Sequence, residues 1–125
     1  MSTDVMPDQA SINHSKLRDT VSALTDLLAM GDYEGLCRLP RTSRLSPAEI
    51  ERVILNYGRQ LMPLPNSAFE AADIIPVSES NPQQWSVVVP LWSKEEGRSD
   101  LSLELTVEDS DTRTYSIEID DLHVL

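Results

Sequence analysis

The sequence is poor in residues that several kinds of functional site require. Cys37 is the single cysteine among 125 residues, which excludes an internal disulfide. The four glycines are scattered, so no glycine-rich loop that cradles phosphate groups is present. No apolar run reaches the roughly 20 residues of a membrane-spanning helix, and no signal-peptide pattern is found. We therefore expect a protein of a reducing, cytoplasmic compartment.

Basic residues are scarce in the second half of the chain, and this scarcity determines the charge. The whole chain has 21 acidic and 10 basic residues, for a net charge of −11. Residues 1–60 have a net charge of −1, whereas residues 61–125 have a net charge of −10. Such a surface repels phosphate backbones and anionic lipid heads. The composition excludes a typical nucleic-acid or membrane binder and favours a basic protein as the partner.

The first half of the chain has the apolar periodicity of helices. After a leader, residues 1–14, that we expect to be disordered, the pattern predicts helices over residues 15–30, 32–39 and 47–61. The third helix has the clearest start, because Ser46 is a capping residue, Pro47 occupies the first helical position and Glu49 completes a capping box. We expect the prolines that follow Leu61 to end it.

The period changes from helical to strand-like after Phe69. We expect strands over residues 74–77, 85–92, 101–107 and 115–119. Pro76 places the first of these strands at a sheet edge. In the last two strands apolar and polar residues alternate, as expected for a hairpin with one buried and one solvent-exposed face. The fold class is therefore α+β. Three N-terminal helices precede an antiparallel sheet of about four strands, curled or flat, in a single domain over residues 15–125.

Several separated motifs resemble an uncharacterised small bacterial family. They are G-D-Y at 31–33, the segment 85–92, E-E-G-R-S-D-L at 95–101 and the ending I-D-D-L-H-V-L at 119–125. The order of elements is also similar to the nuclear transport factor 2-like (cystatin-like) roll, in which a curved sheet surrounds a cavity. The resemblance implies no catalytic residues. Similar rolls occur among ligand-binding enzymes and among immunity proteins that neutralise toxins, so it implies both possibilities.

The acids of residues 61–125 concentrate in connections and on wet strand faces. Like charges on paired strands destabilise a sheet by about 0.2–1 kcal/mol. The leading hypothesis is therefore a non-enzymatic immunity-type protein that occludes a cationic toxin, with Trp92 as the apolar anchor. The predicted partner-binding residues are Trp92, Glu95, Glu96, Asp100, Glu104, Glu108, Asp109, Asp111 and Glu118. The alternative is a solvated, solubilising face, and Arg38, Arg41 and Arg44 are expected to bridge to it.

A second hypothesis is a small-molecule-binding or catalytic roll with a pocket between helices and sheet. Its predicted lining, chosen for groups that transfer protons and for aromatic surface, is Tyr57, Trp85, Asp100, Asp121 and His123. The competing interpretation is structural, with Asp100 bracing a turn and Asp120 and Asp121 marking a bulge in the last strand. A third hypothesis is a homodimerisation module.

The clustered carboxylates also prompt a test for a metal site. Asp109, Asp111 and Asp120 match three positions of a calcium-binding loop, but a threonine occupies the position that requires glycine. In a regular strand Asp121 and His123 share one face and Asp120 points away. The sequence therefore predicts no metal and no cofactor.

Overall fold

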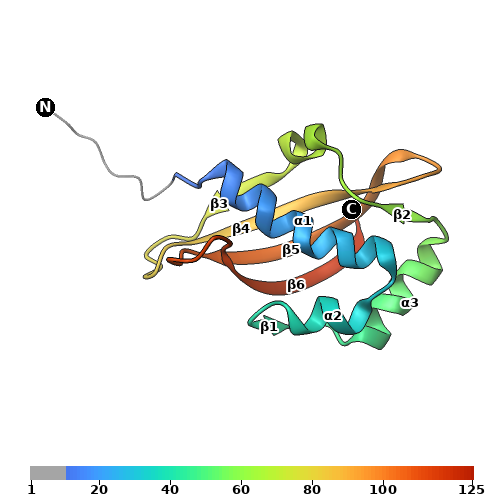
Figure 1. Ribbon diagram of the computed structural model, residues 1–125, viewed down its shortest axis with the longest axis horizontal. Coiled ribbons are helices and arrows are strands. Elements are labelled where there is room, and N and C mark those ends of the chain that lie inside the picture. Colours follow the sequence, from blue (N-terminus) through green and yellow to red (C-terminus); the bar gives the residue numbers. More distant parts are fainter. Residues whose placement is uncertain (1–10) are drawn as a thin grey trace, which may run out of the picture.

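A strongly curled, six-stranded sheet is the largest element of the computed structural model, which describes residues 11–125 (Figure 1). Helix α1 lies across one face of the sheet, and α2 and α3 lie beside β1 and β6. The elements in chain order are α1 (His14–Met30), α2 (Tyr33–Arg38), β1 (Thr42–Ser43), α3 (Pro47–Tyr57), β2 (Leu61–Met62), the 3₁₀ helix η2 (Asn66–Ala71), β3 (Asp73–Pro76), β4 (Gln84–Ser93), β5 (Gly97–Glu108) and β6 (Ser116–Val124). The predicted α+β class is confirmed, and of the two alternatives left open, a curled or a flat sheet, the sheet is curled.

The sheet is larger than the predicted four antiparallel strands, and it is mixed. Its order is β1-β6-β5-β4-β2, with β3 also paired to β4. The neighbours are antiparallel except for β1 and β6, which are parallel. The sequence prediction missed β1 and β2 because two residues are too few to show a period of two. The β5–β6 hairpin and the edge position of β3 are as predicted.

Helix α3 begins as predicted but ends earlier. The side chain of Ser46 accepts a hydrogen bond from the amide of Glu49, and Glu49 accepts one from the amide of Ser46, which completes the capping box. At the other end Gly58 has a φ of 74°, and its amide donates to the carbonyl of Ile54 at 3.1 Å. The apolar Leu61 belongs to β2 instead of extending the helix.

The start of α1 lies within the predicted leader. The side chain of Asn13 caps the helix by accepting from the amide of Lys16 at 3.0 Å, and Ile12 packs against the core. Residues 1–10 of the leader are outside the described residues. None of the helices found in residues 11–125 is long and apolar enough to cross a membrane.

The core lies between α1 and the inner face of the sheet, which we define as the side toward α1. Trp85 is 2% exposed and packs there against Tyr115, with ring centroids 5.4 Å apart. Trp92 is half-buried on the opposite side, so the two tryptophans face opposite sides as their spacing predicted. The main core residues of α1 and the strands are Leu17, Val21, Leu24, Leu28, Val87, Val89, Leu103, Leu105 and Ile119.

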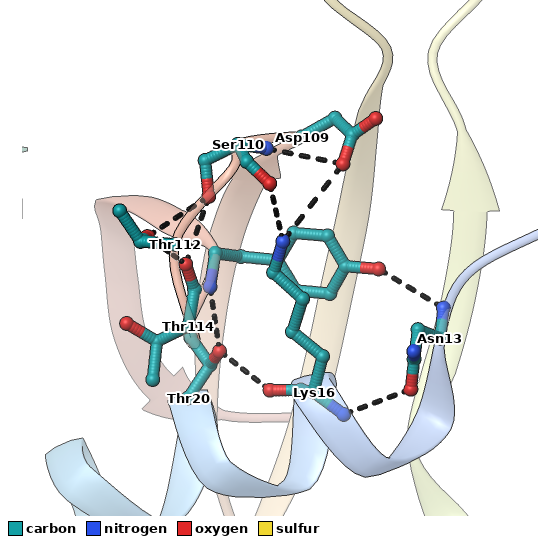
Figure 2. A network of polar contacts seen from close by, with 8 residues as sticks. Asn13, Lys16, Thr20, Asp109, Ser110, Thr112 and Thr114 are labelled. Atoms are coloured by element: carbon teal, nitrogen blue, oxygen red, sulfur yellow. Dashed lines mark hydrogen bonds and ion pairs between the residues drawn. The ribbon is translucent and has the colours of Figure 1, made fainter.

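The acidic β5–β6 turn is attached to the first turns of α1 (Figure 2). Lys16 Nζ donates to the carbonyl of Ser110 at 2.5 Å and lies 4.5 Å from the ring centroid of Tyr115. Thr20 Oγ1 donates to the carbonyl of Lys16 at 2.7 Å and accepts from the amide of Tyr115 at 2.9 Å. These contacts join residues about a hundred positions apart and fix α1 on the sheet.

Replacing Thr20 with valine tests this attachment. Thr20→Val preserves the shape of the side chain but leaves the buried amide of Tyr115 without its acceptor, so we expect a loss of about 1–3 kcal/mol of unfolding free energy. Urea denaturation measures the loss. Thr25→Val on the same helix is the matched control, because the Thr25 hydroxyl makes only a 3.5 Å contact with the carbonyl of Ser22. Equal losses in both variants would contradict the role given to Thr20.

Candidate functional site

The outer face, the side of the sheet away from α1, is where acidic side chains gather. Register pairs Val88 of β4 with Glu104 of β5 and Asp121 of β6. The next row pairs Thr106 with Glu118. These residues are all half-buried rather than covered, unlike the inner-face residues between them. The middle of the sheet therefore presents carboxylates to the solvent.

A bulge in β6 adds a further acid to this face. The register changes between Glu104, paired with Asp121, and Leu105, paired with Ile119, so Asp120 has no partner on β5. Asp120 Oδ2 accepts a hydrogen bond from Thr106 Oγ1 at 2.7 Å. The predicted bulge is confirmed, but the expectation that Asp120 points away from Asp121 is wrong, because the bulge brings both onto the outer face. We call Glu104, Glu118, Asp120 and Asp121 the acidic cluster.

The surroundings of Asp120 disfavour the ionised form of its carboxyl group. Its pKa is raised above the usual value, chiefly by burial, and also by the negative charges of Glu118 and Glu104. The hydrogen bond from Thr106 and the charge of Arg44, whose Nε lies 3.9 Å from Asp120 Oδ1, only partly offset this. The cluster thus holds carboxylates together at an electrostatic cost.

His123 lies between two carboxylates of the acidic cluster. Its Nε2 is 2.6 Å from Glu104 Oε2 and its Nδ1 is 3.0 Å from Asp121 Oδ2. The Nε2 contact lacks the alignment of a hydrogen bond, so it is an ion pair when the ring is protonated. In the part of the chain that the structure describes, no group of three or more His, Cys, Asp or Glu residues has the geometry of a metal site.

Glu95 and Glu96, two predicted partner-binding acids, are engaged within the molecule. Glu96 Oε1 accepts from the Tyr57 hydroxyl at 2.8 Å and from Ser93 Oγ at 3.0 Å, and the Tyr57 bond is the main cause of the lowered pKa of Glu96. The Tyr57 hydroxyl itself accepts from Ser99 Oγ at 2.6 Å. Glu95 Oε1 accepts from the amide of Gln60, the residue before β2, at 3.0 Å. These contacts clamp the β4–β5 connection to the last turn of α3.

The arginines of the α2–α3 region bridge to the sheet, as predicted for two of the three. Arg41 pairs with Glu108 at 3.2 Å, and Arg44 approaches Asp120. Arg38 instead pairs with Glu34 within α2 at 3.9 Å. Glu108 has a lowered pKa, mainly because Gln84 donates a hydrogen bond to it and secondarily because of Arg41. Basic residues from the helical half of the chain therefore neutralise part of the negative charge of the sheet half.

The remaining predicted partner-binding residues are dispersed. Asp109 lies 4.0 Å from Lys16 Nζ in the network of Figure 2, and Asp111 is exposed in the same turn. Trp92 is four positions along β4 from Val88, which is about 13 Å, and its ring lies over Gly97. Glu118 accepts from Thr42 Oγ1 at 3.0 Å but remains half-exposed.

The predicted pocket residues do not meet in one cavity. Trp85 is in the core and Asp121 is on the outer face. Asp100 borders a separate hollow of about 200 Å³. The structure brings together Tyr57 and His123, which border a groove of about 370 Å³ between α3 and the end of β6. Sequence reasoning assigned Asp120 to a bulge rather than to a site, although the adjacent pair of aspartates was the signal for both.

Comparisons with known proteins give one match. A family described as a domain of unknown function (DUF7668) matches residues 25–125. No curated protein and no solved structure matches the chain.

Neutralising Asp120 tests the cost of holding this carboxylate ionised where burial and neighbouring acids disfavour its charge. The pKa of Asp120 is higher in the folded state than in the unfolded state. The stability that its protonated form contributes is therefore complete below the unfolded-state pKa and is lost as the pH rises through the folded-state pKa. At pH 7 we therefore expect the free energy of unfolding of Asp120→Asn to exceed that of the wild type by about 0.2–1 kcal/mol. This is the size of the repulsion between like charges on paired strands. The difference should vanish near pH 3, where the group is protonated in both states.

Urea denaturation at the two pH values measures this difference. Asp111→Asn is the matched control, because it removes the same charge from the exposed turn and should not produce a comparable gain. A wild type as stable as Asp120→Asn at pH 7 would show that the cluster is not strained by its charge.

Proposed function

This chain belongs to the DUF7668 family of domains of unknown function, and from its own residues we propose that it is an acidic protein-interaction module. Its outer face docks a cationic protein. The observation that carries the proposal is the acidic cluster, in which the bulge at Asp120 adds a carboxylate to a face that already holds Glu104, Glu118 and Asp121.

The electrostatics of the cluster support binding rather than folding as its role. Ionised Asp120 is disfavoured by its surroundings, as its raised pKa indicates. A sequence selected only for stability would place lysines among such acids. Within residues 11–125 the basic side chains that approach the cluster are Arg44, which is 74% exposed at its side chain, and His123. A partner's lysines and arginines would supply the missing positive charge and raise the association rate by steering.

The docking surface proposed now is narrower than the one predicted from sequence. Glu95, Glu96, Glu108 and Asp109 each have partners inside the molecule, so their charges are partly used for folding. The acidic cluster brings four carboxylates onto one face, and the basic side chains beside them are Arg44 and His123. We therefore centre the interface on the cluster instead of on Trp92.

An immunity-type role fits this surface. A toxin that cleaves or binds nucleic acid presents basic residues to phosphates. Carboxylates spaced along β5 and β6 would occupy those positions and occlude the toxin by competition. The half-barrel curl of the sheet is compatible with nuclear transport factor 2-like (cystatin-like) rolls, a class that includes immunity proteins, and the bacterial cytoplasm would be the compartment.

A ligand-binding roll is the second candidate function. The groove between α3 and β6 favours it, because Tyr57 and His123 both border that groove. The Tyr57 hydroxyl is already bonded to Glu96 and Ser99, however, which leaves it little capacity for a substrate. The acidic cluster therefore supports docking better than the groove supports catalysis.

A salt-resolved pull-down with charge variants tests the docking proposal. The sheet variant Glu104→Gln/Glu118→Gln/Asp121→Asn removes charge from the cluster, and we expect it to lose a cationic protein that the wild type captures from native lysate at low salt. The matched helix variant Asp19→Asn/Asp26→Asn/Glu51→Gln changes the net charge equally at exposed positions of α1 and α3 and should retain capture. High salt should release the wild-type complex. Equal capture by both variants, or equal loss, would contradict docking at the outer face.

A further inference from the structure

The edge of β6 is open over its second half. Strand β1 covers only Glu118 and Ile119, and its last bond is the donation from the amide of Arg44 to the carbonyl of Ile119 at 2.9 Å. Strand β6 continues to Val124 and, among the described residues, pairs there with β5 alone. Such an edge is a template for pairing with another chain.

Two backbone amides at this edge are oriented away from β5, although Leu122 as a whole residue is only 2% exposed. The amide of Leu125 donates to the carbonyl of Asp100, so this group faces β5. Because successive amides of a strand alternate in direction, the amides of Val124 and Leu122 face the open side. The Leu122 amide is held by the adjacent side chain of Asp121 at 2.8 Å, a contact that an incoming carbonyl would replace. Val124 is 55% exposed.

The two sides of an added strand would meet different surroundings. Toward α3, alternate side chains would enter the groove of about 370 Å³, which Val53 of α3 and Leu122 and Val124 of β6 line with apolar surface. On the outer face, the other side chains would lie beside Asp120 and Asp121. The edge therefore fits an extended segment in which apolar residues alternate with basic residues.

The charge of β6 argues against a second copy of this chain as the occupant. Pairing two copies through their open edges would bring Asp120 and Asp121 of one copy close to the same acids of the other. Like charges opposite each other destabilise a strand pair. A cationic segment has the opposite effect.

We propose that β6, from Asp120 to Val124, binds an extended cationic segment of a partner protein by strand addition. This inference rests on the proposed function, from which it takes the cationic partner. What it adds is the mode of binding. Main-chain hydrogen bonds supply the affinity, the groove selects apolar residues and the acidic cluster selects the basic residues that alternate with them.

Titration of the full-length, ¹⁵N-labelled protein with the peptide acetyl-KVKVKV-amide tests the proposal by NMR. We expect saturable shifts at the amides of Leu122 and Val124 and slowed exchange of both. The same peptide with N-methyl groups on every second amide keeps its charge but cannot form the main-chain hydrogen bonds of a strand pair. We expect its affinity to be lower by at least about tenfold. Val124→Pro, which removes an edge amide at the exposed end of the strand, should weaken binding similarly, whereas Val124→Thr should not.

The outcomes separate the binding mode from the proposed function. No shift at the β6 edge, or equal binding of the N-methylated peptide, overturns strand addition and leaves salt-dependent docking to the pull-down. Edge binding that is unchanged in Glu104→Gln/Glu118→Gln/Asp121→Asn, and equal for acetyl-EVEVEV-amide, supports strand addition and contradicts the acidic docking surface.

Discussion

The bulge at Asp120 is the local constraint on which the account of the outer face depends. One unpaired residue in β6 shifts the register so that consecutive aspartates lie on the same face, next to Glu104 and Glu118. The hydrogen bond from Thr106 holds Asp120 there although its pKa is raised by burial and like charge. Without the bulge, strand alternation would divide the acids between two faces. The concentration of charge is therefore a product of backbone geometry as well as of composition.

The nearly neutral helical half determines how much of the acidic charge remains free. Lys16 of α1 neutralises the β5–β6 turn, and Arg41 neutralises Glu108 at the start of that turn. The last turn of α3 binds the β4–β5 connection through Tyr57. These contacts attach the helices at both ends of the sheet, and the basic side chains near its middle are His123 and the exposed Arg44. Folding thus uses the peripheral acids, and the central acids are available for a partner.

Local signals were sufficient for the elements with strong patterns. The capping box of Ser46 and Glu49 and the alternation in β5 and β6 predicted a helix start and a hairpin that the structure confirms. Two-residue strands such as β1 carry no period, and the end of α3 was placed too late because an apolar Leu61 outweighed Gly58. Which acids are neutralised depends on contacts such as that between Lys16 and Ser110, 94 positions apart, and no local pattern encodes those.

The central claim is that the acidic cluster touches the partner's cationic groups. Zero-length carbodiimide cross-linking tests it most directly, because the reagent joins a carboxylate to a lysine amine only where the two are in contact. Applied to the complex captured at low salt and read by mass spectrometry, it should place cross-links from partner lysines at Glu104, Glu118 and Asp121. Cross-links confined to exposed acids of the helices, such as Asp19, Asp26 and Glu51, would contradict the claim.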